Sequence, residues 1–263
     1  MNKILFVYCL LGYINISWGA NELREMEHAE AIEASFSTGK VVWIDAQGKK
    51  FLTLYTETEQ VDSLGAVIIL HPMDGHADQQ KIINPLRTYL PAHHWATLSV
   101  QLPVLGLEAS EREYYQLIDD ARVRIQESLE FLLDKKVKNI VLIGYGLGGM
   151  MAIDFVNESP DSDEIDALVT ISLSVPESDH KHVQVIDFIG NIKQPFLDIF
   201  AEFDLPVVTD SARKRRLAGN ENLLYRQIRM EGEGHLFQHD EGLLVKRVYS
   251  WINRTFREMK PSK

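Results

Sequence analysis

Residues 140–149 read IVLIGYGLGG and are followed at 150–153 by MMAI. Four consecutive aliphatic residues predict a strand that is buried on both faces, and the glycine-rich part after them predicts a sharp turn. The apolar run that comes next predicts a helix. A strand, a turn and a helix in immediate succession form the repeating unit of a mostly parallel α/β sheet. Because ligand sites in such sheets lie at the carboxyl ends of the strands, Gly146 at the apex of this turn is where a site is expected.

The segments on both sides of this unit alternate between strands and helices. Apolar and β-branched runs predict further strands at 41–46, 51–55, 66–71, 96–102, 167–172, 196–200 and 223–230. The first two of them predict a hairpin, and apolar residues at helical spacing predict helices over 118–132 and 244–259. No linker rich in Pro, Gly or Ser divides the chain. The sequence therefore predicts a single α/β domain, with a mostly parallel central sheet and helices on both faces.

The composition is that of an ordinary globular protein. Of its 263 residues, 45% are hydrophobic and 25% are charged, which excludes a disordered or collagen-like chain. The 38 acidic residues outnumber the 27 basic ones and give a formal net charge of -11. Since this charge repels a phosphate backbone, we expect no nucleic-acid partner.

The N-terminal residues 1–19 have the organisation of a signal peptide. Lys3 is followed by an apolar stretch over 4–16 and then by Ser-Trp-Gly-Ala, which fits cleavage after Gly19. The stretch is shorter than the roughly 17 to 25 residues that span a bilayer. We therefore expect an exported, periplasmic protein whose mature domain, residues 20–263, contains no transmembrane segment. The one cysteine, Cys9, lies in the part expected to be removed, so the mature chain would have no thiol.

Two further residues follow predicted strands in an order that is typical of a catalytic site. Asp204 comes just after the strand predicted at 196–200, and His235 follows the last predicted strand. Together with the turn at Gly146 and the loop at 70–73, they resemble the α/β-hydrolase superfamily, in which nucleophile, acid and histidine occur in this order. The resemblance extends along nearly the whole mature chain. Within the superfamily, the chain looks most like exported hydrolase-like proteins of Gram-negative bacteria.

The departure from that pattern decides the predicted function. The resemblance implies a serine at position 146, but glycine has no side chain that His235 could deprotonate or that could carry an acyl group. What remains is an oxyanion hole made by the Leu147 and Met73 N–H groups, with Asp204 orienting His235. We therefore predict a non-catalytic binding or accessory protein whose partner is an unknown small molecule or an envelope protein.

Two alternatives keep an enzymatic function. In one, Asp204 and His235 activate a water molecule for ester hydrolysis. In the other, the nucleophile is displaced to Ser172 or Ser174, at the end of the strand expected beside the elbow strand. Serine at a strand end more often serves a turn than a reaction, which disfavours the second alternative.

A different reading of the same glycines is dinucleotide binding. Gly144, Gly146 and Gly149 fit the pattern G-x-G-x-x-G between a strand and a helix. That pattern opens the first βαβ unit and is followed by an acidic residue at the end of the next strand. Here several strands come first, and the next strand ends in TISLS over 170–174 without a carboxylate. We expect no nucleotide cofactor.

Two clusters of charged or metal-ligating residue types have competing interpretations. His71, Asp74, His76 and Asp78 are residue types that bind zinc, but their spacing matches no closed metal site, so no metal is expected and a loop-shaping role is favoured. The basic run at Arg213–Arg216 predicts a solvated helix face. Its alternative is a contact surface of a scaffold protein in an envelope complex.

Overall fold

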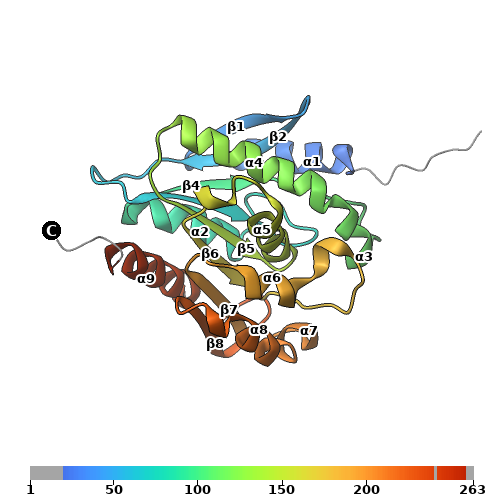
Figure 1. Ribbon diagram of the computed structural model, residues 1–263. Coiled ribbons are helices and arrows are strands. Elements are labelled where there is room, and N and C mark those ends of the chain that lie inside the picture. The colour runs from blue at the N-terminus through green and yellow to red at the C-terminus, as the bar shows by residue number, and fades with distance from the viewer. Residues whose placement is uncertain (1–19, 240–241, 259–263) are drawn as a thin grey trace, which may run out of the picture.

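One eight-stranded sheet organises the chain, with the strand order β1-β2-β4-β3-β5-β6-β7-β8 (Figure 1). The computed structural model describes residues 20–239 and 242–258, so the predicted signal peptide lies outside the described residues. The strands pair in parallel from β4 through β8, whereas β1 with β2 and β2 with β4 pair antiparallel. The bounds of the strands are β1 Lys40–Ala46, β2 Lys49–Thr56, β3 Gly65–Leu70, β4 Trp95–Val100, β5 Ile140–Tyr145, β6 Ala167–Ile171, β7 Phe196–Phe203 and β8 Tyr225–Gly234.

Burial explains why the central strands read as continuous apolar runs. Every residue of β3, β4, β5 and β6 is buried, because helices cover both faces of the sheet. The predicted hairpin of β1 and β2 is confirmed, with Gly48 at a φ of 88° and its N–H donating to Asp45. All strands predicted from the sequence are present.

Helices lie on both sides of the sheet, as predicted. Side chains such as Leu142 pack with α4, α5 and α6 in one core, and alternating side chains such as Val141 pack with α2 and α9 in the other. The helices are α1 Glu22–Ser35, α2 Ile83–Tyr89, α3 Glu111–Tyr114, α4 Ile118–Asp134, α5 Leu147–Glu158, α6 Val185–Asn191, α7 Pro206–Thr209, α8 Ala212–Ala218 and α9 Leu243–Glu258. Within residues 20–239 and 242–258, no helix is both long enough and apolar enough to cross a membrane.

Helix α1 was not predicted from the sequence. It begins after Asn21, whose side chain accepts a hydrogen bond from the Arg24 N–H and so caps the helix. Its buried residues, Ala29 and Ile32, pack against strand β2 through Leu52 and Leu54. This helix therefore adds a cover over the N-terminal hairpin and, as described below, reaches the candidate site.

Candidate functional site

The turn between β5 and α5 has the backbone geometry of a strained elbow. Gly146 has a φ of 54° and a ψ of −120°, a region that residues with a Cβ rarely adopt. Its neighbours are glycines for a different reason, which is close packing. A Cβ on Gly144 would lie 2.3 Å from the carbonyl oxygen of Gly148, and a Cβ on Gly148 would lie 2.4 Å from that of His71. The glycine-rich sequence is thus set by both the turn and the approach of strand and helix.

The space above Gly146 is open enough for a small side chain. A Cβ placed there would meet Pro72 Cβ at 3.3 Å and Pro72 Cα at 3.9 Å, with no other non-neighbouring atom within 4 Å. A side chain at this position would therefore require Pro72 to move by a few tenths of an ångström. The same distances place the Pro72–Met73 loop directly over the elbow.

Asp204 and His235 are brought together next to this elbow. Asp204 follows β7 and His235 follows β8, and the two strands are neighbours in the sheet. His235 Nδ1 lies 2.7 Å from Asp204 Oδ1. The Tyr145 hydroxyl donates to the His235 carbonyl oxygen at 3.1 Å, which ties the histidine loop to the elbow strand. The acid and the histidine thus form the pair that the sequence predicted.

Asp204 is held as a carboxylate by several donors. Burial raises the pKa of its side chain, but hydrogen bonds from His235, Ser172 and the backbone outweigh burial and leave the pKa below its usual 3.8. Oδ2 accepts from Ser172 Oγ at 2.5 Å and from the Ala201 N–H at 3.0 Å, while Oδ1 accepts from the Leu205 N–H at 2.9 Å. An ionised Asp204 in this position orients the imidazole of His235 and favours its Nδ1–H form.

Ser172 supports the acid of the pair through a hydrogen bond. Its hydroxyl is buried and is bonded to Asp204, and its φ of 50° bends the chain at the end of β6. Ser174 donates instead to Glu111 at 3.2 Å. Across the described ranges, neither hydroxyl makes a hydrogen bond to His235. The positioning role of Ser172 was not predicted from the sequence, although its place at the end of the strand beside β7 was a usable signal.

The two proposed oxyanion donors lie in suitable local structure. Leu147 is the first residue of α5, where helix N–H groups have no intrahelical acceptor. Met73 is in a turn closed by a hydrogen bond from the Gly75 N–H to the Pro72 carbonyl oxygen, with Asp74 at a φ of 58°. In the described part of the chain, neither the Leu147 nor the Met73 N–H donates to an acceptor. Both groups are thus free to bind an oxygen atom of a ligand.

Helix α1 holds the Met73 loop in place. Arg24 Nη1 lies 2.8 Å from Asp74 Oδ1 and donates to the Leu105 carbonyl oxygen at 2.6 Å. The Tyr114 hydroxyl donates to the same carboxylate oxygen at 2.9 Å, and the Leu105 N–H donates to that hydroxyl. Asp74 is therefore part of a structural network that fixes the turn next to Met73.

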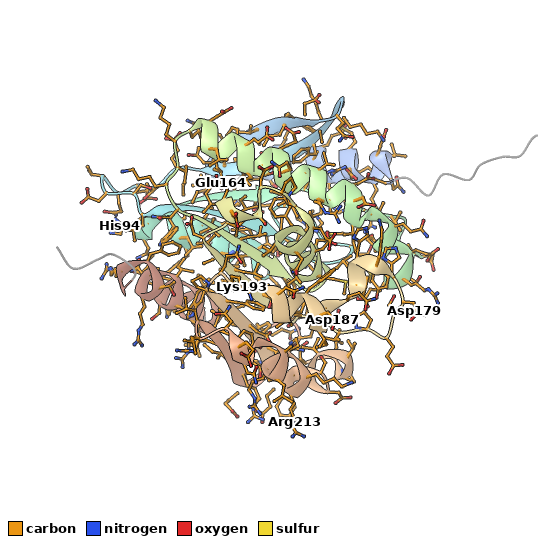
Figure 2. All side chains as sticks on the ribbon, in the orientation of Figure 1. His94, Glu164, Asp179, Asp187, Lys193 and Arg213 are labelled. Atoms are coloured by element: carbon orange, nitrogen blue, oxygen red, sulfur yellow. The ribbon has the colours of Figure 1, made fainter. Side chains whose placement is uncertain are left out.

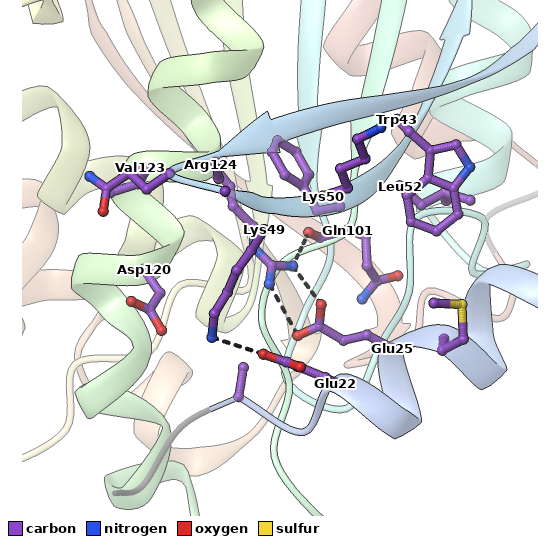
Figure 3. A pocket seen from close by; sticks show the side chains of 16 residues that line it. Glu22, Glu25, Trp43, Lys49, Lys50, Leu52, Gln101, Asp120, Val123 and Arg124 are labelled. Carbon is purple, nitrogen blue, oxygen red and sulfur yellow. Dashed lines mark hydrogen bonds and ion pairs between the residues drawn. The ribbon is translucent and has the colours of Figure 1, made fainter.

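A cavity of about 390 Å³ lies between α1, the β1–β2 hairpin and α4 (Figure 3). Arg124, which is almost fully buried, bonds to Glu25 at 2.8 Å and to the Gln101 carbonyl oxygen at 2.9 Å beside it. None of the residues that line this cavity is Gly146, Asp204 or His235. The cavity is thus separate from the elbow site, and its ion pair serves to anchor α1 on α4.

Comparison with sequence families assigns the chain. The family described as "Protein of unknown function (DUF3530)" matches residues 16–117 and 111–254. The chain belongs to the DUF3530 family. Among curated proteins, none matches this sequence.

Solved structures similar to this DUF3530 protein are hydrolases and esterases. Est1E from Butyrivibrio proteoclasticus has a TM-score of 0.67 at 16% identity, over 82% of this chain and 99% of that chain. The esterase Pf2001 from Pyrococcus furiosus has a TM-score of 0.67 at 19% identity, over 84% and 92% of the two chains. Dienelactone hydrolase from Anabaena variabilis has a TM-score of 0.64 at 18% identity, over 82% and 96%. At such identities the likeness establishes the fold, which is the α/β-hydrolase fold in a single domain.

The histidines and carboxylates considered as metal ligands are engaged elsewhere in this DUF3530 protein. His71 donates from Nδ1 to the Pro72 carbonyl oxygen at 2.8 Å and accepts at Nε2 from the Leu102 N–H at 2.9 Å. His76 accepts from the Asp78 N–H, and the Asp78 carboxylate pairs with Arg87 at 2.8 Å. Over residues 20–239 and 242–258, no group of three or more His, Cys, Asp or Glu side chains is placed to hold a metal ion.

The buried His71 predicts acid sensitivity of the fold. Burial lowers the pKa of His71 from 6.5 to about 3, so the unfolded chain binds a proton between these values that the folded chain does not bind. The free energy of unfolding is therefore expected to fall as the pH drops below 6.5, by up to about 1.4 kcal/mol per pH unit. Urea unfolding at a series of pH values measures this slope.

The matched comparison uses two histidine variants. His71→Gln is expected to flatten the difference between neutral and acid stability, because its side chain binds no proton in either state. His239→Gln is the control, since the side chain of His239 is 78% exposed. A wild-type profile that superimposes on that of His71→Gln after a constant offset would show that His71 does not govern the acid response.

The basic run is divided between surface and core. Arg213, Lys214 and Arg216 on α8 are exposed, and Arg213 extends away from the fold in Figure 2. Arg215 is fully buried and bonds from Nε to Asp198 Oδ2 at 2.8 Å. The prediction of a solvated face is confirmed for three of the four cations and is wrong for Arg215. Its side chain points inward because position 215 lies on the face of α8 that packs on β7.

Proposed function

We propose that this DUF3530 protein is exported to the periplasm and acts there as a non-catalytic binding or accessory protein. The observation that carries the proposal is the glycine at the apex of the elbow, at the position where a hydrolase of this fold presents its nucleophile. Without an oxygen at residue 146, no covalent acyl intermediate can form there. The contact between Asp204 and His235, with the free N–H groups of Leu147 and Met73, supports retention of this site for ligand binding.

The free groups of the site favour a ligand with a carbonyl or carboxylate oxygen. The Leu147 and Met73 N–H groups are both free, and Leu147 stands at the positive end of the α5 dipole. The side chain of His235 is partly exposed and can donate or accept a hydrogen bond. A small organic acid or the exposed carbonyl group of a partner protein would satisfy these donors.

An ester-hydrolysis assay tests the proposal. Wild-type protein and His235→Ala are compared on short acyl esters, and we expect equal, slow rates, because the oxyanion hole alone gives only about 10³ to 10⁴ over the reaction in water. Wild-type turnover that disappears in His235→Ala would contradict a non-catalytic role. Calorimetric titration with short-chain carboxylates measures binding directly, and the same titration of His235→Ala reports whether the ligand occupies this site.

The geometry of Asp204 and His235 favours one second candidate, hydrolysis by activated water. The 2.7 Å contact and the lowered pKa of Asp204 are the arrangement that a general base needs. In that case, the ester assay would show turnover that depends on His235. A serine-directed phosphonate would leave the protein unmodified, whereas a displaced serine nucleophile would be labelled and could be mapped by mass spectrometry.

A further inference from the structure

We propose that β8 is a dimerisation edge, which pairs antiparallel with β8 of a second copy of this chain. This strand is the last in the sheet order, and no strand of the described residues lies beyond it. At ten residues it is long for an edge strand, and unpaired edges of this kind are templates for another strand.

The backbone of β8 offers alternate residues to a partner. The carbonyl oxygen of Leu224, just before β8, accepts from the Phe196 N–H, so even-numbered residues up to Met230 turn their backbone groups toward β7. Beyond Met230 the register with β7 shifts at a bulge, where Gly232 has a φ of 73° and its N–H donates to the Glu202 side chain. Since backbone groups alternate in direction along a strand, those of Gln227 and Arg229, before the bulge, point away from the sheet. They are therefore positioned to form the ladder of an added strand.

The order of charges along β8 makes the edge complementary to itself. The exposed Arg226 and Arg229 come first in the strand, and the exposed Glu231 follows them, whereas Glu233 is buried and accepts from the His239 N–H. Antiparallel pairing centred on Met230 places each Arg229 opposite the second copy's Glu231, and the two-fold axis repeats this contact. Within one copy, Arg229 contacts Glu231 at 2.7 Å and lies 3.8 Å from Glu202, so in the dimer the second copy's Glu231 would be a third carboxylate near its guanidinium group. Charges on an edge usually prevent pairing, but this order of signs attracts a second copy.

Exposed leucines flank the proposed contact. Leu223 and Leu224, just before β8, are 85% and 46% exposed, and Leu236, just after it, is 42% exposed. In an antiparallel pair, the start of one strand lies beside the end of the other. These leucines lie in the turns before and after the strand, so they add exposed apolar surface at the two ends of the proposed contact without being part of its ladder.

Sedimentation analysis of the purified protein over a concentration series tests this proposal. We expect a dimer, and we expect Arg229→Glu or Glu231→Arg to raise its dissociation constant by about tenfold or more, because each reversal places two like-charged pairs in the interface. The double variant Arg229→Glu/Glu231→Arg restores opposite charges across the two-fold axis. It is therefore expected to return the dissociation constant close to that of wild type.

The control is Lys40→Glu, which reverses a charge in an exposed ion pair with Glu57 on the opposite edge of the sheet. This variant is expected to dimerise as wild type does. Far-UV circular dichroism verifies that each variant is folded. A wild-type protein that stays monomeric throughout, or a dimer that neither single reversal weakens, would overturn the proposal.

Discussion

Replacing Gly146 with serine is expected to give this protein esterase activity. We expect the rate on short activated acyl esters to rise by at least about 100-fold over wild type, since a missing nucleophile removes most of the acceleration of a hydrolase triad. Spectrophotometric release of nitrophenol from nitrophenyl esters measures the gain. The expectation rests on the proposed function, in which Gly146 stands at the nucleophile position and lacks a hydroxyl group, while Asp204 and His235 would act on a serine placed there.

The geometry permits this substitution. A Cβ at residue 146 meets only Pro72, at 3.3 Å from Pro72 Cβ, so a small shift of the proline ring makes room. His235 is already oriented by Asp204 at 2.7 Å, and the Leu147 and Met73 N–H groups are free to bind the oxyanion. The φ of 54° strains any residue with a Cβ, by about 1 to 3 kcal/mol.

Two matched variants separate chemistry from strain. Gly146→Ala carries the same Cβ and the same backbone strain as Gly146→Ser but has no hydroxyl, and we expect it to remain at the wild-type rate. Gly146→Ser/His235→Ala keeps the hydroxyl and lacks the base, and we expect it to lose the gain. If the folded Gly146→Ser protein shows no increase in esterase activity, the similarity to hydrolases does not extend to the geometry of a catalytic triad.

The second large effect is expected from Arg215, in the core beneath α8. Arg215→Ala should lower the free energy of unfolding by about 3 to 5 kcal/mol, because it leaves the buried carboxylate of Asp198 without its counter-charge. Asp198 Oδ2 would still accept from Tyr225 Oη at 3.0 Å and from Gln227 Nε2 at 2.9 Å, but both donors are neutral. Urea unfolding followed by tryptophan fluorescence measures the loss.

The neighbouring cations supply the control for this experiment. Arg213→Ala removes the same kind of side chain from the exposed face of α8, and we expect a change within about 0.5 kcal/mol. The double variant Asp198→Leu/Arg215→Met removes both buried charges and should recover much of the stability, since Asp198 Oδ1 and Arg215 Nη2 have no partner among the described residues. Equal effects of Arg213→Ala and Arg215→Ala would exclude a structural ion pair.

The sequence sufficed for the sheet and for the central pair of the candidate site. The central strands are buried on both faces, which produces apolar runs that are recognisable without any tertiary information. Asp204 and His235 were predictable because each follows a strand at the same edge of a parallel sheet. Adjacent parallel strands bring their carboxyl ends together, so order along the chain becomes proximity in space.

The features that could not be predicted from the sequence depend on contacts between segments that are distant in the chain. Helix α1 is stabilised by Arg24 and Glu25, whose partners lie in the Met73 loop and in α4, so its own residues gave no sufficient signal. The inward direction of Arg215 is hidden in a run of four cations, because only the packing of α8 decides which one faces the core. The bond from Ser172 to Asp204 likewise depends on the spacing between β6 and the loop after β7.

The contacts of α1 also set an order for how the chain can reach its final form. Arg24 binds residues 50 and 81 positions later in the chain, and Glu25 binds Arg124, 99 positions later. These partner residues must be synthesised and brought together by folding before α1 can pack against them. Although α1 precedes them in the chain, we therefore expect it to pack late in folding. Until then the turn beside Met73 lacks the restraint from Arg24, so a nascent chain is expected to form its sheet before its candidate site is complete.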